Sequence, residues 1–158
     1  MQLSEKGLAE IKSSEAFKAR PYQDSVGIWT IGYGSTFYLD GKRVSKSDPP
    51  ITEKQAELLL LEVFKKNYAG HIPDGLNQHQ YDAIASLIYN IGSRNFNLST
   101  LKKKILLNPN DLSIKAEFLK WNKGTKSGKL VVIDGLTNRR KREADLYFMP
   151  IKEEGLSN

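Results

Sequence analysis

The stretch from residue 22 to residue 46 restricts where this chain can form a sheet. Residues 28–34 have the composition of a strand, because aromatic and β-branched side chains dominate and turn residues come before them. Asp40-Gly41 is a strong signal for a tight turn between residues 36–39 and 42–44. Apolar residues elsewhere recur with the period of a helix. We therefore predict an α+β fold that is mostly helical, with one small antiparallel sheet.

Helices are predicted on both sides of this sheet, and capping signals mark where two of them begin. Ser4 is the expected N-cap of a helix over residues 3–17. Thr52 and Gln55 form a capping box before a long helix over residues 53–68. The other predicted helices cover residues 77–91, 101–107, 110–121 and 137–147, and residues 123–135 are predicted as a loop.

These elements predict one domain over residues 1–158, built as two lobes. The first is an N-terminal α+β lobe of about residues 12–52, and the linking helix at about 53–68 follows it. The second is an all-helical lobe of about residues 69–150, against which helix 3–17 packs. A cleft between two lobes is a favoured place for a binding site, so we expect the site there.

The composition argues against several kinds of site. The chain has no cysteine and only two histidines, so neither a disulfide nor a zinc site is supported, and we expect no metal and no cofactor. The N-terminus lacks the basic start and apolar run of a signal peptide. The longest apolar run, residues 58–61, is far too short to span a bilayer. We expect a soluble monomer, made in the cytosol, that does not insert stably into a membrane.

The net charge of +6 lies entirely in the second half of the chain. Residues 1–79 carry ten basic and ten acidic side chains, whereas residues 80–158 carry fourteen and eight. A basic half suggests a polyanionic partner such as an acidic wall polymer, and a lysine-rich soluble surface is the plain alternative. Nucleic acid is not expected, because no helix-turn-helix spacing or aromatic-basic interleaving is present. In the basic run at residues 139–142, Arg139 or Arg140 is interpreted as an anchor of the last helix, through a carboxylate such as Glu143 or one in the first helix.

Three polar residues around the predicted strand form a candidate catalytic set: Glu15, Asp24 and Thr30. Glu15 continues the apolar stripe of its helix, which disfavours its charged form and suits a general acid. Asp24 lies in a polar turn, where it can stay ionised. A hydroxyl at Thr30 can hold a water beside Asp24 by donating to the carboxylate and accepting from the water. Two carboxyls in different environments are what hydrolysis of a glycosidic bond requires.

The same three residues carry a resemblance to a known family. The segment EAFKARPYQDSVGIWTIGYGST resembles the catalytic motif of phage lysozymes of glycoside hydrolase family 24. In this motif eight residues separate Glu from Asp and five separate Asp from Thr, and Ile-Gly-Tyr-Gly follows. Residues 89–92 are similar to the family's aromatic, amide, apolar, glycine segment. Residues 135–143, with Gly-Leu, Arg-Arg and Glu, resemble the temperate-phage endolysin branch. The resemblance covers roughly residues 5–148.

The resemblance implies a lysozyme-like two-lobe fold and an endolysin activity. Such a muramidase hydrolyses the β-1,4 bond between N-acetylmuramic acid and N-acetylglucosamine in peptidoglycan. Glu15 is then the general acid, Asp24 activates or positions the water, and Thr30 lies beside it. By matched position, the candidates for contact with the glycan strand are Tyr33, Thr36, Tyr89 and Asn90. Core packing is the alternative for both tyrosines.

Two other functions stay open at this level. A lytic transglycosylase cleaves the same bond without water and needs mainly one acid, and a non-catalytic wall-binding module needs none. The matched spacing of the catalytic set argues against both. Without a signal peptide, the protein is expected to accumulate in the host cytoplasm until a membrane-permeabilising partner releases it to the periplasm and cell wall.

Overall fold

The protein is described by a computed structural model that covers residues 1–152. The chain divides into two compact units. One contains residues 9–70, and the other contains residues 1–8 together with the chain from residue 71 onward. The first helix, α1 (Glu5–Glu15), and the short 3-10 helix η1 (Ala69–His71) each contribute residues to both units. The predicted lobe boundaries stay predictions.

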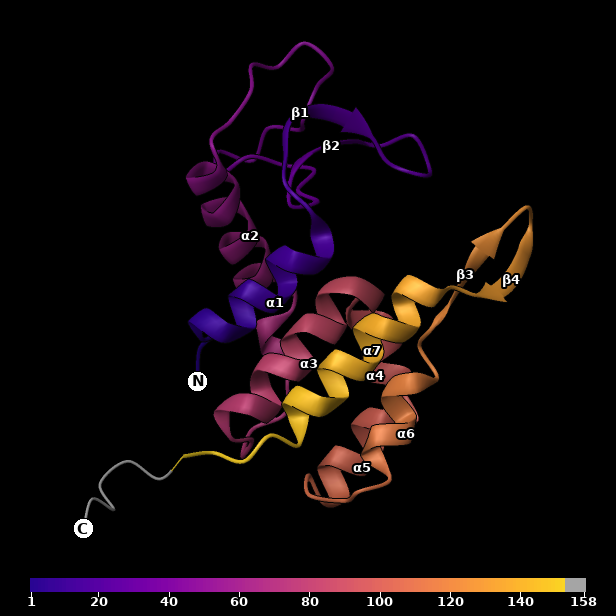
Figure 1. Ribbon diagram of the computed structural model, residues 1–158. Helices are drawn as coiled ribbons and strands as arrows, with labels where there is room; N and C mark the ends of the chain where they lie inside the picture. Colours follow the sequence, from indigo (N-terminus) through magenta and orange to yellow (C-terminus); the bar gives the residue numbers. More distant parts are fainter. Residues whose placement is uncertain (153–158) are drawn as a thin grey trace. The chain divides into compact units, whose positions relative to one another are not determined.

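The unit of residues 9–70 is built on an antiparallel hairpin and one helix (Figure 1). Strand β1 (Lys18–Gln23) pairs with β2 (Trp29–Gly32), and helix α2 (Glu53–Asn67) packs against β2. Ile31, Val44 and Leu59 form the buried apolar cluster between the sheet segment and this helix. The unit therefore holds the hairpin rigidly at its β2 strand.

The sheet differs in two respects from the prediction. The strand β1 extends through Pro21 and Tyr22 to Gln23, where a turn was predicted, and proline is tolerated because only β2 pairs with this edge strand. The hairpin predicted around Asp40-Gly41 contains one isolated bridge, between Phe37 and Arg43, in place of two strands.

The start of α2 agrees with the prediction. Thr52 accepts a hydrogen bond from the backbone N–H of Gln55, and the Gln55 side chain accepts one from the Thr52 N–H. This reciprocal capping satisfies two backbone donors that have no partner inside the helix. The local sequence alone therefore determines where α2 begins.

The second unit is helical and is organised around α3 (Gln78–Ile91) and α7 (Asp134–Tyr147), which lie side by side (Figure 1). Three shorter helices complete it: α4 (Ser93–Leu98), α5 (Thr100–Leu107) and α6 (Ile114–Leu119). Asn77 caps α3 with Gln80 in a second capping box, and Ser99 caps α5. No helix within residues 1–152 is long and apolar enough to cross a membrane.

The first turn of α1 is fixed to α3 by a side-chain cap. Ser4 Oγ accepts from the Gly7 N–H at 3.2 Å and donates to the buried carboxylate of Asp82. A side chain on Gly7 would lie 2.6 Å from that carboxylate, so only glycine fits there. Ser4 therefore both begins the helix, as predicted, and attaches it to α3.

Three further predictions about the helical unit were incomplete or wrong. Residues 123–135 were predicted as a loop, but β3 (Lys123–Lys126) and β4 (Lys129–Val132) form a hairpin whose two turn residues have positive φ. Helix α4 was not predicted, and α6 is shorter than the predicted range 110–121. Ser127-Gly128 is the signal for this tight turn, and its lysine-rich flanks concealed the strands.

We expect Gly32→Ala to destabilise the unit of residues 9–70 more than Gly41→Ala does. Both glycines have positive φ, so each alanine costs about 1–2 kcal/mol in backbone strain. A Cβ on Gly32 would lie 3.0 Å from the Ala56 Cβ of α2, whereas a Cβ on Gly41 meets nothing within 4 Å. Overpacking adds roughly 1–3 kcal/mol at Gly32 alone. Urea unfolding of both variants measures the difference, and equal losses would refute the close approach of β2 to α2.

Candidate active site

The β1–β2 hairpin brings two residues to the same face. Tyr22 is the register partner of Thr30, so their side chains project on the same side of the hairpin. The Asp24 N–H donates to the Ile28 carbonyl at 2.9 Å, which extends the pairing by one residue into the turn. Asp24 follows Tyr22 at the strand period of two. The hairpin thus carries Thr30 and Tyr22 on one face, and Asp24 lies in the turn that follows Tyr22.

The carboxylate of Asp24 is held by the turn that it begins. Its Oδ1 accepts hydrogen bonds from the backbone N–H groups of Val26 and Ile28, each at 2.9 Å. Two amide donors on one oxygen fix the orientation of the carboxylate. Within residues 1–152, no protein donor is bound to Oδ2, which is therefore available to a water molecule or a ligand.

Thr30 is buried, with 3% of its surface exposed. Its hydroxyl donates to the Ile28 carbonyl at 2.9 Å, so its one hydrogen is used there and not on Asp24 as the sequence suggested. The oxygen can still accept a hydrogen bond. Thr30 can therefore orient a water only by accepting from it.

Glu15 is the last residue of α1 and is partly buried. A Cβ placed on Gly34 would lie 3.8 Å from its Oε2, so the backbone at Gly34 runs beside the carboxylate. Gly34 has a φ of +93°, a conformation that glycine adopts without strain. This glycine leaves one side of the Glu15 carboxylate uncovered by a side chain.

The pKa values of two tyrosines depend on the charges of the candidate carboxylates. Burial raises the pKa of Tyr22, and the negative charges of Glu15 and Asp24 raise it further. Burial also raises the pKa of Tyr68, and the charge of Glu15 adds to this effect. Tyr22 thus lies within electrostatic reach of both carboxylates.

Sequence reasoning did not identify Tyr22 or Tyr68 as site residues. The signal for Tyr22 is its spacing, two residues before Asp24 on what proves to be a strand. Tyr68 follows α2, and no sequence pattern connects it with Glu15. No group of three acidic or histidine side chains in the described part of the chain could hold a metal ion.

The predicted glycan contacts differ in their surroundings. Tyr33 is 2% exposed and donates its hydroxyl to Glu53 at 2.8 Å, which favours the packing alternative. Thr36 is partly buried and accepts from the Val44 N–H through its carbonyl. Tyr89 and Asn90 lie in the last turn of α3, in the other unit, and Asn90 is exposed.

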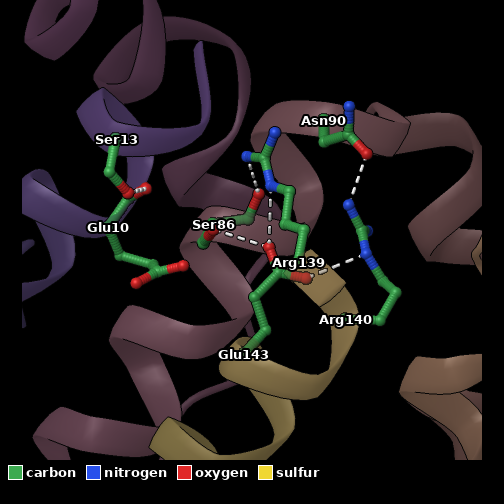
Figure 2. A network of polar contacts seen from close by, with 7 residues as sticks. All are labelled: Glu10, Ser13, Ser86, Asn90, Arg139, Arg140 and Glu143. Carbon is green, nitrogen blue, oxygen red and sulfur yellow. Dashed lines mark hydrogen bonds and ion pairs between the residues drawn. The ribbon is translucent and has the colours of Figure 1, made fainter. Parts of the chain in front are cut away.

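The basic run at residues 139–142 is partly buried in a polar network (Figure 2). Glu143 lies 3.2 Å from Arg139 Nε and 3.0 Å from Arg140 Nε, which confirms that this carboxylate anchors the arginines. Ser86 of α3 donates to Glu143 at 2.6 Å. Burial raises the pKa of Glu143, and the charges of Arg140 and Arg139 oppose this shift. The network joins α7 to α3.

Comparisons with known proteins agree over nearly the whole chain. The sequence profile of the phage lysozyme family matches residues 12–143. The endolysin of Acyrthosiphon pisum secondary endosymbiont phage 1 is 43% identical over 151 residues, covering 93% of this chain and 98% of that protein. The solved endolysin from Escherichia coli O157:H7 phage FAHEc1 superposes with a TM-score of 0.83 at 39% identity, covering 98% of both chains. A mutant of P22 lysozyme superposes with a TM-score of 0.78 at 35% identity, covering 94% of this chain and 99% of that chain.

We expect charge-removing substitutions to shift the titration of the two tyrosines selectively. Glu15→Gln lowers the pKa of both Tyr22 and Tyr68, because each phenolate loses a repelling charge, whereas Asp24→Asn lowers only that of Tyr22. Tyr38 is the internal control, since burial and Asp48 raise its pKa to about 12 in every variant. NMR titration of the tyrosine rings measures these shifts. An unchanged Tyr22 in Glu15→Gln would show that the carboxylates do not share a site.

Proposed function

The chain belongs to the phage lysozyme family, and from that premise we propose that Glu15, Asp24 and Thr30 form its active site. The family makes the protein a glycosidase, a muramidase of the endolysin type that hydrolyses peptidoglycan in host-cell lysis. The lysozyme-like fold predicted from the sequence is confirmed by the solved relatives. The bond assigned is the β-1,4 link between N-acetylmuramic acid and N-acetylglucosamine.

Glu15 is proposed as the general acid. It is the last residue of α1 and is partly buried, and the family motif that it begins assigns it this role. The absence of a side chain on Gly34 leaves room for that oxygen beside the carboxyl. Loss of the proton to the glycosidic oxygen breaks the bond from the anomeric carbon and leaves Glu15 ionised.

Asp24 is proposed as the base that activates water. Two backbone amides hold its Oδ1, so Oδ2 is the oxygen that accepts the proton of the attacking water. The second hydrogen of that water can be donated to Thr30 Oγ1. An inverting reaction needs the two carboxyls about 6.5–9.5 Å apart to accommodate this water. The single observation that supports the assignment most is that two backbone amides hold Asp24 Oδ1 in the turn of the hairpin that also carries Thr30.

The two alternative functions receive less support. A lytic transglycosylase needs no fixed base. In this chain two backbone donors hold Asp24, and the same hairpin carries the buried Thr30. A wall-binding module needs no such arrangement. Mass spectrometry of the digested wall distinguishes the reactions, because hydrolysis yields reducing ends and transglycosylation yields anhydro-sugars.

The finer assignments of partner and location belong to the same proposal. The protein acts as a monomer on peptidoglycan glycan strands, does not bind nucleic acid and does not insert stably in the membrane. A membrane-permeabilising partner releases it from the host cytoplasm to the wall.

Glu15→Gln should abolish wall lysis while the protein stays folded, because an amide has no proton to give to the leaving oxygen. A loss of at least about 100-fold is expected for removal of a general acid. Turbidity clearing of chloroform-treated Gram-negative cells measures it, with circular dichroism as the folding check. Glu62→Gln is the matched control, since Glu62 pairs with Lys66 one turn further along α2. Lysis retained in Glu15→Gln would overturn the assignment.

Thr30→Val should lower activity about 100-fold, whereas Thr30→Ser should retain most of it, because serine keeps the hydroxyl. The valine variant also loses the hydrogen bond to the Ile28 carbonyl, at a stability cost of about 0.5–1.5 kcal/mol, since that carbonyl still accepts from the Asp24 N–H. Assays well below the melting temperature separate the two effects. A folded Thr30→Val protein with normal turnover would mean that the hydroxyl serves the fold alone.

A further inference from the structure

We infer that Arg140, held by Glu143, orients the side-chain amide of Asn90 so that its N–H donors face outward to bind a carbonyl oxygen of the glycan. The inference rests on the proposed function, since it assigns the polarity of one predicted glycan contact. The Arg140–Glu143 pair acts through Asn90, so both are positioning residues and do not touch the substrate.

The contacts run from a buried carboxylate to an exposed amide (Figure 2). Glu143 and Arg140 on α7 are both fully buried, and Arg140 Nε lies 3.0 Å from Glu143 Oε1. Arg140 Nη2 donates to Oδ1 of Asn90, which is exposed at the end of α3. A surface side chain is thereby held from beneath by an ion pair with no access to solvent.

The chemistry of the guanidinium group decides which way the amide points. Arginine has five N–H donors and no acceptor, so only the oxygen of Asn90 can face it. The nitrogen of the same amide must then point away from Arg140. Within the described residues, no protein group accepts from that nitrogen, so its two hydrogens are available to a ligand.

The rest of the network prevents the pair from rotating. Glu143 Oε2 accepts from Ser86 Oγ at 2.6 Å and from Arg139 Nε at 3.2 Å. Arg139 also donates to the Ser86 carbonyl at 3.0 Å, which fixes it to the backbone of α3. Charge-assisted hydrogen bonds among buried groups are strong and directional. The Asn90 amide is therefore preorganised, and the cost of ordering it is met by folding and not by binding.

An outward-facing N–H pair recognises an acceptor of a particular kind. Both sugars of peptidoglycan carry an acetamido group, whose carbonyl oxygen is a strong neutral acceptor. A hydroxyl oxygen is the weaker alternative on the same chain. A pair of N–H donors on α3 that binds a carbonyl oxygen would therefore select for acetamido sugars over plain glucose polymers.

Asn90→Asp tests the polarity with the least change in shape. Aspartate keeps an acceptor toward Arg140, with an added charge, but presents an oxygen where the amide nitrogen was. We expect unchanged or higher thermal stability, about tenfold or greater weakening of affinity for chitotetraose, and a raised KM with kcat little changed. Affinity is measured by NMR titration in the Glu15→Gln background, so that binding is read without turnover. Normal affinity and normal KM in folded Asn90→Asp would overturn the inference.

Arg140→Lys tests the positioning role. A single ammonium can pair with Glu143 but cannot also hold Asn90 with the geometry of a guanidinium, so KM is expected to rise several-fold with kcat retained. Arg142→Lys makes the same change at an exposed position of α7 and should leave KM unchanged. If Arg140→Lys proves unfolded, Asn90→Asp still decides the question. The two failures can be told apart. If the wild-type protein does not cleave peptidoglycan, the proposed function is refuted. If its binding of chitotetraose still depends on Asn90, this inference stands.

Discussion

Two backbone amides, those of Val26 and Ile28, hold one oxygen of the Asp24 carboxylate in the turn between β1 and β2. The Asp24 side chain thereby takes up the Ile28 N–H, while the Asp24 N–H continues the ladder to the Ile28 carbonyl. The same carbonyl also receives the hydroxyl of Thr30. One short turn thus fixes both the proposed base and its neighbouring hydroxyl, and any change in the turn would move both groups.

The rigidity of this turn depends on how β2 is supported. Gly32 has no side chain and Ala56 has a small one, so the strand can approach α2 closely. Ile31, between the hairpin and the helix, is fully buried. Packing on one side of β2 therefore leaves the other side, with Thr30 and its partner Tyr22, to serve the site.

The helical unit uses buried charge for a comparable purpose. An isolated carboxylate in a protein interior is costly. Glu143 is tolerated because Ser86 and Arg139 donate to its Oε2 and the charge of Arg140 lies 3.0 Å from its Oε1. Such a network contributes less to stability than apolar packing of the same volume would. Its value lies in orientation, since it fixes α7 to α3 and determines which atom of Asn90 faces outward.

The sequence by itself determined the helix starts at Ser4 and Thr52, because a cap is formed by residues three apart and needs nothing from the rest of the fold. It also led to the proposal of Glu15, Asp24 and Thr30 as the catalytic residues, since their spacing matches a family motif. It did not reveal β1, where Pro21 concealed an edge strand, or the β3–β4 hairpin among lysines.

Only the tertiary structure decided that the Thr30 hydroxyl donates to the Ile28 carbonyl, that Tyr33 is buried and donates to Glu53, and that Tyr22 lies near both carboxylates. It alone connected Arg140 with Asn90, fifty positions away in the chain. Caps are local and can be read along the chain, whereas hydrogen-bond partners of buried groups depend on which distant segments the packing brings together.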